Sequence, residues 1–140
     1  MEKKTKILCI DYGSKWSGLS ISDTDKKLAM GLTCINTDKL INSLKDIIKI
    51  ENIYLIVLGY PINLNNKHQK ITKQVLEFKT QILKKYPKII VDLIDERYTS
   101  QLAKYYLYKF KYRKTNFKSQ LNVMSSILIL QSYLKVLKKK

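Results

Sequence analysis

Acidic side chains close two mostly apolar runs of this sequence. Asp11 follows the run 7–10 and precedes a turn at Gly13, whereas Asp95 and Glu96 follow the run 89–94. A carboxylate at the end of a buried strand is costly unless it is paired or used. Two such strand ends in a chain of net charge +16 therefore predict a metal site in a protein that meets a polyanion.

Each acidic segment also has other interpretations. The carboxylate of Asp11, next to its tight turn, could bind a cation, lie near nucleotide phosphates as in the actin and sugar-kinase superfamily, or cap its own turn. The kinase interpretation is disfavoured because such proteins need two lobes and a much longer chain. The segment 95–99, Asp-Glu-Arg-Tyr-Thr, could be a surface turn with an ion pair worth little energy. Because side chains alternate along a strand, Asp95 and Glu96 would face opposite sides, and only one need face the site.

Three other features have open roles. Gly59 ends a continuous apolar strand and allows close approach by a ligand, but a plain strand-to-helix turn explains it equally well. His68, the single histidine, is expected to be an exposed loop residue. Cys9 and Cys34 lack metal-ligand spacing and lie in apolar runs, so buried thiols are expected.

The charge of the chain favours a nucleic-acid partner. There are 27 Lys and Arg against 11 Asp and Glu, and the segment 104–118 interleaves aromatic with basic residues, a pattern that can stack bases and bind phosphate. A bias of an AT-rich genome toward Lys, Ile, Asn and Tyr is a second source of this composition. Half of the aromatic rings in 104–118 are also expected to belong to a helix core.

The elements that must position these residues follow from the hydrophobic pattern. Strands are expected at 6–12, 17–22, 28–35, 54–59 and 89–95. Helices are expected from a cap at Thr37 or Asp38 to about Ile50, from about Ile71 to Tyr86, at about 100–110 and from about Ser119 to Leu137. A meander of three strands followed by alternating strands and helices predicts an α/β fold with a mixed sheet of about five strands, flanked by helices. Catalytic groups in such folds gather at the carboxyl ends of the strands, where Asp11 and Glu96 can converge.

The length and composition are those of one domain spanning residues 1–140. No apolar stretch approaches the roughly 20 residues of a membrane span, and the N-terminal residues have no signal-peptide core. A cytoplasmic location without membrane contact is therefore expected. The last helix is apolar almost all round over 123–130, which fits either a sandwiched core helix or part of a dimer surface.

Four stretches in order resemble the YqgF family, also called RuvX-like, within the RNase H-like superfamily. The resemblance runs from Ile7 to Leu134. The matching stretches are Ile10 to Lys15 with Gly18 and Ser22-Asp23, then Gly59 to Asn63, then Asp95 to Thr99 with Ala103, and finally Ile127 to Leu134.

This resemblance implies an RNase H-like fold and a nuclease that matures the 5′ end of 16S ribosomal RNA; Holliday junction resolution is an earlier proposal for the family. It implies that Asp11 and Glu96 hold Mg²⁺ or Mn²⁺. A third acid is expected on the last helix, where this chain has Asn122. An amide oxygen can bind Mg²⁺ but brings no charge, so the second metal should be weakened.

The leading hypothesis is a metal-dependent endonuclease acting on structured RNA, namely precursor 16S rRNA, alone or in a ribosomal precursor particle. Asp11, Glu96 and Asn122 would form its catalytic centre. Lys15, Arg97 and Lys118 would contact nucleic acid. One alternative is a binding module that kept the fold and lost the chemistry, and another is a resolvase of branched DNA, which would have to be a dimer. The sequence fits a monomer or a homodimer.

Overall fold

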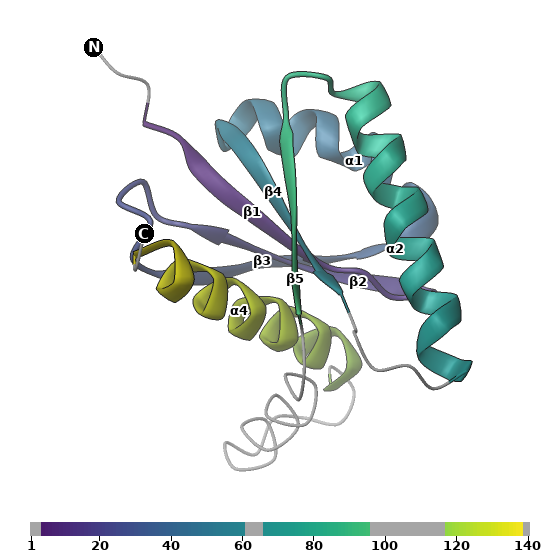
Figure 1. Ribbon diagram of the computed structural model, residues 1–140. Coiled ribbons are helices and arrows are strands. Elements are labelled where there is room, and N and C mark those ends of the chain that lie inside the picture. Colours follow the sequence, from purple (N-terminus) through teal and green to yellow (C-terminus); the bar gives the residue numbers. More distant parts are fainter. Residues whose placement is uncertain (1–3, 61–65, 96–116, 139–140) are drawn as a thin grey trace.

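The computed structural model describes residues 4–60, 66–95 and 117–138, and the statements below concern those residues (Figure 1). They form one five-stranded sheet in the order β3-β2-β1-β4-β5. The strands are β1 (Lys6–Asp11), β2 (Trp16–Ser22), β3 (Ala29–Asn36), β4 (Ile53–Tyr60) and β5 (Ile90–Asp95). The first three strands pair antiparallel, whereas β4 and β5 run parallel to β1. The predicted mixed sheet of five strands is confirmed.

Helices cover both faces of the sheet. Figure 1 shows α1 (Thr37–Ile50) and α2 (Asn66–Lys85) on one side and α4 (Phe117–Lys138) on the other. Alternate residues of β1 serve the two cores: Leu8 and Ile10 pack with α1 and α2, whereas Ile7 and Cys9 pack with α4. The central strands are buried on both faces because helices lie on both, which is why β1 and β4 read as continuous apolar runs.

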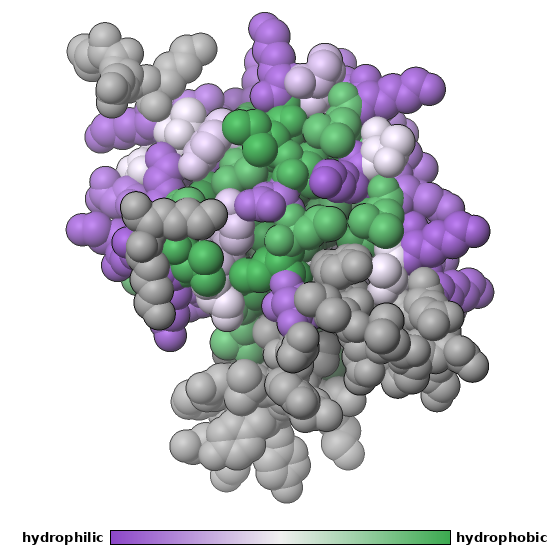
Figure 2. Space-filling model, viewed as in Figure 1, coloured by the Kyte–Doolittle hydropathy of each residue, from purple (hydrophilic) through white to green (hydrophobic). Residues whose placement is uncertain are grey.

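One side of the last helix, α4, packs into the core against the sheet. Ile129, Leu130 and Leu134 are buried against the sheet, while Val136 on the outer side is exposed. Of the two expected roles for this helix, packing into the core is confirmed for its inner face. In Figure 2 apolar side chains gather in the middle of the side that carries α4 and β5, with hydrophilic ones around them. No helix in the described ranges is long and apolar enough to cross a membrane.

Several predicted boundaries need correction. The N-cap of α1 is Asn36, whose side chain accepts a hydrogen bond from the Asp38 backbone N–H at 3.0 Å, and not Thr37 or Asp38. The helix α2 begins at Asn66, so position 68 belongs to a helix and not to a loop. The helix α4 begins at Phe117, two residues earlier than predicted. The helix expected at about 100–110 lies outside the described residues.

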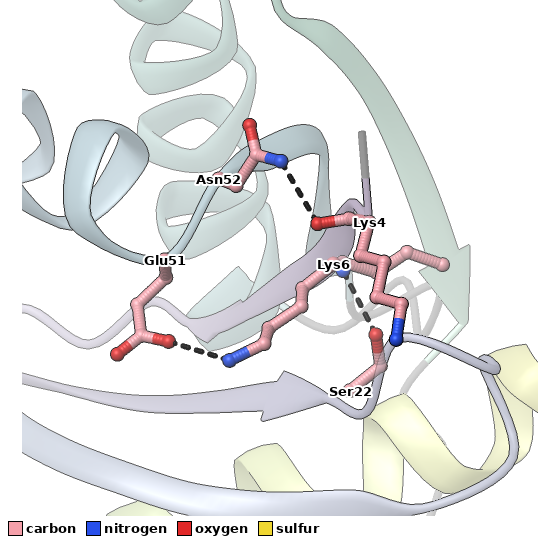
Figure 3. A network of polar contacts seen from close by, with 6 residues as sticks. Lys4, Lys6, Ser22, Glu51 and Asn52 are labelled. Carbon is pink, nitrogen blue, oxygen red and sulfur yellow. Dashed lines mark hydrogen bonds and ion pairs between the residues drawn. The ribbon is translucent and has the colours of Figure 1, made fainter. Parts of the chain in front are cut away.

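A polar network ties the amino ends of β1 and β4 together, at the edge opposite Asp11 (Figure 3). Asn52 has a left-handed backbone (φ 54°), and its Nδ2 donates to the Lys4 carbonyl at 2.8 Å. Its own carbonyl accepts from the Lys6 N–H at 3.1 Å, and the Lys6 ammonium pairs with Glu51 at 2.9 Å. The Ser22 hydroxyl accepts from the Ile7 N–H at 2.8 Å. The turn between α1 and β4 is therefore fixed to β1.

We expect Asn52→Ala to lower the free energy of unfolding by about 1–2 kcal/mol, because alanine disfavours the left-handed backbone and lacks the amide. Urea unfolding measures this difference. Asn52→Gly is the matched control, because glycine tolerates the backbone and removes only the hydrogen bond. An alanine variant as stable as the glycine variant would show that the backbone conformation contributes nothing.

Candidate active site

The carboxyl ends of three parallel strands meet at one edge of the sheet. Ile10 of β1 is level with Leu58 of β4, and Gly59 of β4 is level with Ile94 of β5. Asp11 and Asp95, each the last residue of its strand, therefore stand at the same edge. The predicted convergence of Asp11 with Glu96 stays a prediction, because residue 96 lies outside the described residues.

The two aspartates face opposite sides of the sheet. Asp11 shares its face with Ile7 and Cys9, which pack against α4. By the same alternation Asp95 shares its face with Val91 and Leu93, which pack in the core under α1 and α2. Asp95 therefore lies on the opposite face of the sheet from Asp11 and α4. Glu96 and Arg97, and the side chain of Lys118, lie outside the described residues.

The helix α4 rests directly on β2 beside Asp11. Gly18 pairs with Asp11, and a Cβ built on Gly18 would lie 2.0 Å from the Asn122 carbonyl oxygen. One turn further, the Ser126 hydroxyl lies 2.8 Å from the Ser20 hydroxyl and donates to the Cys9 carbonyl at 3.0 Å. These contacts set the position of α4 along the strand, so that Asn122 lies over Gly18, next to the strand that carries Asp11.

The side chain of Asn122 points toward the outer edge of the sheet. Its Nδ2 donates to the Cys34 sulfur at 3.7 Å, and Cys34 pairs with Gly18 from β3. Asp11, Gly18 and Cys34 thus form a row across three strands on the α4 face, and Asn122 lies above its middle. The expectation of a buried thiol holds for Cys9 but is wrong for Cys34, which is partly exposed because β3 is an edge strand.

The turn after Asp11 is fixed by hydroxyl groups at the start of α1. The Thr37 hydroxyl donates to the Gly13 carbonyl at 2.7 Å and lies 2.8 Å from the Ser17 hydroxyl. Ser17 in turn accepts from the Gly13 N–H at 3.3 Å. Lys15 is exposed at this turn, and its carbonyl accepts from the Thr37 N–H at 2.8 Å. No local signal in the sequence links the Ser17 and Thr37 hydroxyls, which lie 20 residues apart in the chain, so their role at this turn was not predicted.

Another acid on this face has a structural partner. The Tyr133 hydroxyl of α4 donates to Asp92 Oδ2 at 2.9 Å. Burial and then the adjacent carboxylate raise the pKa of Tyr133 above its ordinary value, so the hydroxyl stays protonated and donates at neutral pH. Asp92 therefore anchors α4 to β5 and lies three residues before the end of its strand.

The side-chain oxygens of Asp11 and Asn122 are ligands of the kind that Mg²⁺ and Mn²⁺ bind. A carboxylate and an amide oxygen are hard oxygen ligands. Within residues 4–60, 66–95 and 117–138, no group of three or more His, Cys, Asp or Glu side chains could hold a metal ion. Within this part of the chain, Asp11 and Asn122 are the predicted ligands that the structure describes.

The contact between Gly18 and α4 leads to a prediction about packing. We expect Gly18→Ala to lower the free energy of unfolding by about 2 kcal/mol, because a methyl group would overlap the Asn122 backbone and force α4 off the sheet. Gly31→Ala is the matched control: its Cβ would meet the Val123 side chain at 2.7 Å, and a side chain can move more easily than a helix backbone. Urea unfolding compares the two variants, and equal losses would contradict the assigned contact.

This sheet order, with helices on both faces and an aspartate at the end of the first strand, defines the RNase H-like class. Two solved structures share the fold. "T. thermophilus RuvC in complex with Holliday junction substrate" matches with TM-score 0.60 and 9% identity over 96% of each chain. A Fowlpox virus resolvase in complex with Holliday junction DNA matches with TM-score 0.54 and 15% identity, over 94% of this chain and 98% of that one.

The family model "RuvX: Holliday junction resolvase" matches residues 5–136. A "Putative pre-16S rRNA nuclease" of Karelsulcia muelleri is 40% identical over 94% of this chain and 99% of its own length. A protein of the same name from Phocaeicola vulgatus is 33% identical over 93% of this chain and 95% of its own length. The chain belongs to the RuvX family, a family of nucleases, which confirms the resemblance found in the sequence.

Proposed function

We propose that this protein is a nuclease that hydrolyses phosphodiester bonds in the processing of precursor 16S rRNA. The observation that carries the proposal is Asp11, which ends the first strand on the face of α4, beside Gly18 and Asn122. Relatives that match nearly the whole chain bear the name of this activity. The net charge of +16 suits an RNA substrate, free or within a ribosomal precursor particle in the cytoplasm.

In this proposal Asp11 and Glu96 hold Mg²⁺ or Mn²⁺, and the Asn122 oxygen completes the site. Glu96 is preferred over its neighbour because Asp95 shares a face with Val91 and Leu93, away from α4. The cation, when bound, offsets the charge that develops on the scissile phosphate and lowers the pKa of an attacking water. The pairing of Asp11 with Gly18 fixes the backbone from which its carboxylate extends, and in this proposal Lys15, Arg97 and Lys118 bind neighbouring phosphates.

Cleavage of a defined precursor tests the proposal. The purified protein is incubated with precursor 16S rRNA carrying its 5′ extension, with Mg²⁺ or Mn²⁺, and the new 5′ ends are mapped. A four-way DNA junction serves as the comparison substrate, because the family description and both structural neighbours name Holliday junctions. Cleavage of the RNA at one position supports the proposal, whereas cleavage of the junction alone would favour resolution of DNA.

One observation favours a second candidate, a binding module without catalysis. Asn122 is an amide where the resemblance predicts a carboxylate, and its nitrogen donates to Cys34. Such a module would bind RNA in a salt-sensitive way, and Asp11→Asn would leave its role in rRNA maturation intact. Loss of maturation in cells that carry Asp11→Asn would contradict this candidate.

A further inference from the structure

Trp16 is an exposed aromatic residue beside the candidate site. It is the single tryptophan of the chain, and 47% of its surface is exposed. Tryptophan is highly buried on average in folded proteins because its ring is large and mostly apolar. A half-exposed indole next to a charged strand end is therefore a candidate contact for a ligand.

The indole lies on the same face and at the same edge of the sheet as Asp11. Trp16 is the first residue of β2, two positions before Gly18, which pairs with Asp11. Side chains two apart share a face, and two residues of a strand span about 7 Å. Ser20, two residues beyond Gly18, contacts Ser126 of α4, which identifies this face as the α4 face.

The backbone under the indole is held firmly. The carbonyl oxygen of Trp16 would lie 2.2 Å from a Cβ on Gly13, so the turn folds tightly onto this residue. Ser17 is fully buried and joins the hydroxyl pair with Thr37, while Trp16 itself pairs with Asn36 of β3. The ring therefore projects from a backbone fixed relative to Asp11, which lowers the entropy lost when a flat ligand stacks on it.

We propose that Trp16 stacks on an unpaired RNA base next to the phosphate that is cleaved. Aromatic side chains bind single-stranded nucleic acid through the face of the base, in any sequence, while basic groups bind the backbone. Lys15, exposed and adjacent in sequence, supplies such a charge, and the net charge of +16 favours a polyanion over an apolar protein partner. The position of the phosphate rests on the proposed function, and the stacking itself does not.

Intrinsic fluorescence tests the stacking directly, because Trp16 is the single tryptophan in the chain. The wild-type protein is titrated, without divalent metal, with a short single-stranded RNA, with the same RNA carrying one run of abasic positions, and with a duplex. We expect quenching by the intact single strand and much less by the abasic strand or the duplex. Equal quenching by the abasic strand would overturn the proposal, because phosphate contact alone would then explain it.

Variants separate stacking from general binding. With a labelled single-stranded RNA, Trp16→Ala should bind about 5- to 150-fold more weakly than the wild type, and Trp16→Phe should recover part of that loss. Leu28→Ala is the matched control, because Leu28 is also exposed (61%) but lies just before β3, at the far end of the sheet. Thermal melts verify that the variants fold. An unchanged affinity in folded Trp16→Ala would refute the stacking even if the wild type cleaves RNA, whereas weakened binding without any cleavage would refute only the nuclease proposal.

Discussion

We expect the Asp11→Asn variant to cleave precursor 16S rRNA on the order of 10³-fold more slowly than the wild-type protein, because a ligand of the catalytic cation contributes several kcal/mol to stabilising the transition state. The amide keeps the size and shape of the side chain and removes its charge. The substitution leaves the backbone pairing of residue 11 with Gly18 in place, so the strand β1 should persist. RNA binding measured without metal should change little, since the substitution alters no Lys or Arg residue.

Asp92→Asn is the matched control for Asp11→Asn. Asp92 also lies on the α4 face of a parallel strand, but its carboxylate accepts a hydrogen bond from Tyr133 away from the strand end. This control should lose some stability and keep most of its cleavage rate. Metal binding gives an independent readout: Mn²⁺ should raise the melting temperature of the wild type and of Asp92→Asn more than that of Asp11→Asn. Equal cleavage by both variants would exclude Asp11 from the catalytic centre.

The parts of the fold that the sequence predicts well are those with a local signal. The strands β1 and β4 contain continuous apolar runs, Ile7 to Ile10 and Ile53 to Leu58, and such runs favour strands buried on both faces. Because the pattern alternates strands with helices after the meander, the strand ends were expected at one edge, and Asp11 and Asp95 do lie there. The family motifs added the expected residue roles, which residue patterns alone left open.

The parts that the sequence could not predict depend on contacts between distant segments. Nothing near Gly18 indicates that its missing side chain makes room for the Asn122 backbone, although the glycine and the small residues Ser125 and Ser126 are a signal in retrospect. The residue pattern predicts a cap of α1 at Thr37 or Asp38, but Thr37 fixes the turn at Gly13, and Asn36 caps the helix. Asn36, Thr37 and Asp38 are all residue types that can cap a helix, and the tertiary contacts determine that Asn36 is the cap.

The second large effect concerns the amide at the centre of the site. We expect Asn122→Asp to cleave RNA up to about 100-fold faster than the wild type when Mg²⁺ is scarce, a change of the size that groups supporting a metal site typically produce. Asn122 lies over Gly18, between Cys34 and the strand that carries Asp11, so a carboxylate there that turns from Cys34 toward Asp11 would share the proposed cation with it. At saturating Mg²⁺ the gain should shrink, because the added charge acts mainly by holding the metal.

Two control variants distinguish a general effect of the added charge on cleavage from an effect through metal affinity. Asn36→Asp adds the same charge at the same end of the sheet, where aspartate caps a helix as well as asparagine does, and it should leave cleavage unchanged. Asn122→Ala removes the side-chain oxygen, and its cleavage rate should not exceed that of the wild type.

Without metal, Asn122→Asp should be less stable than the wild type, because two carboxylates then lie near each other. Added Mn²⁺ should reverse that order of stability in a thermal melt. If Mn²⁺ stabilises Asn122→Asp no more than Asn36→Asp, residue 122 is not a metal ligand, and the nuclease must complete its site with other residues.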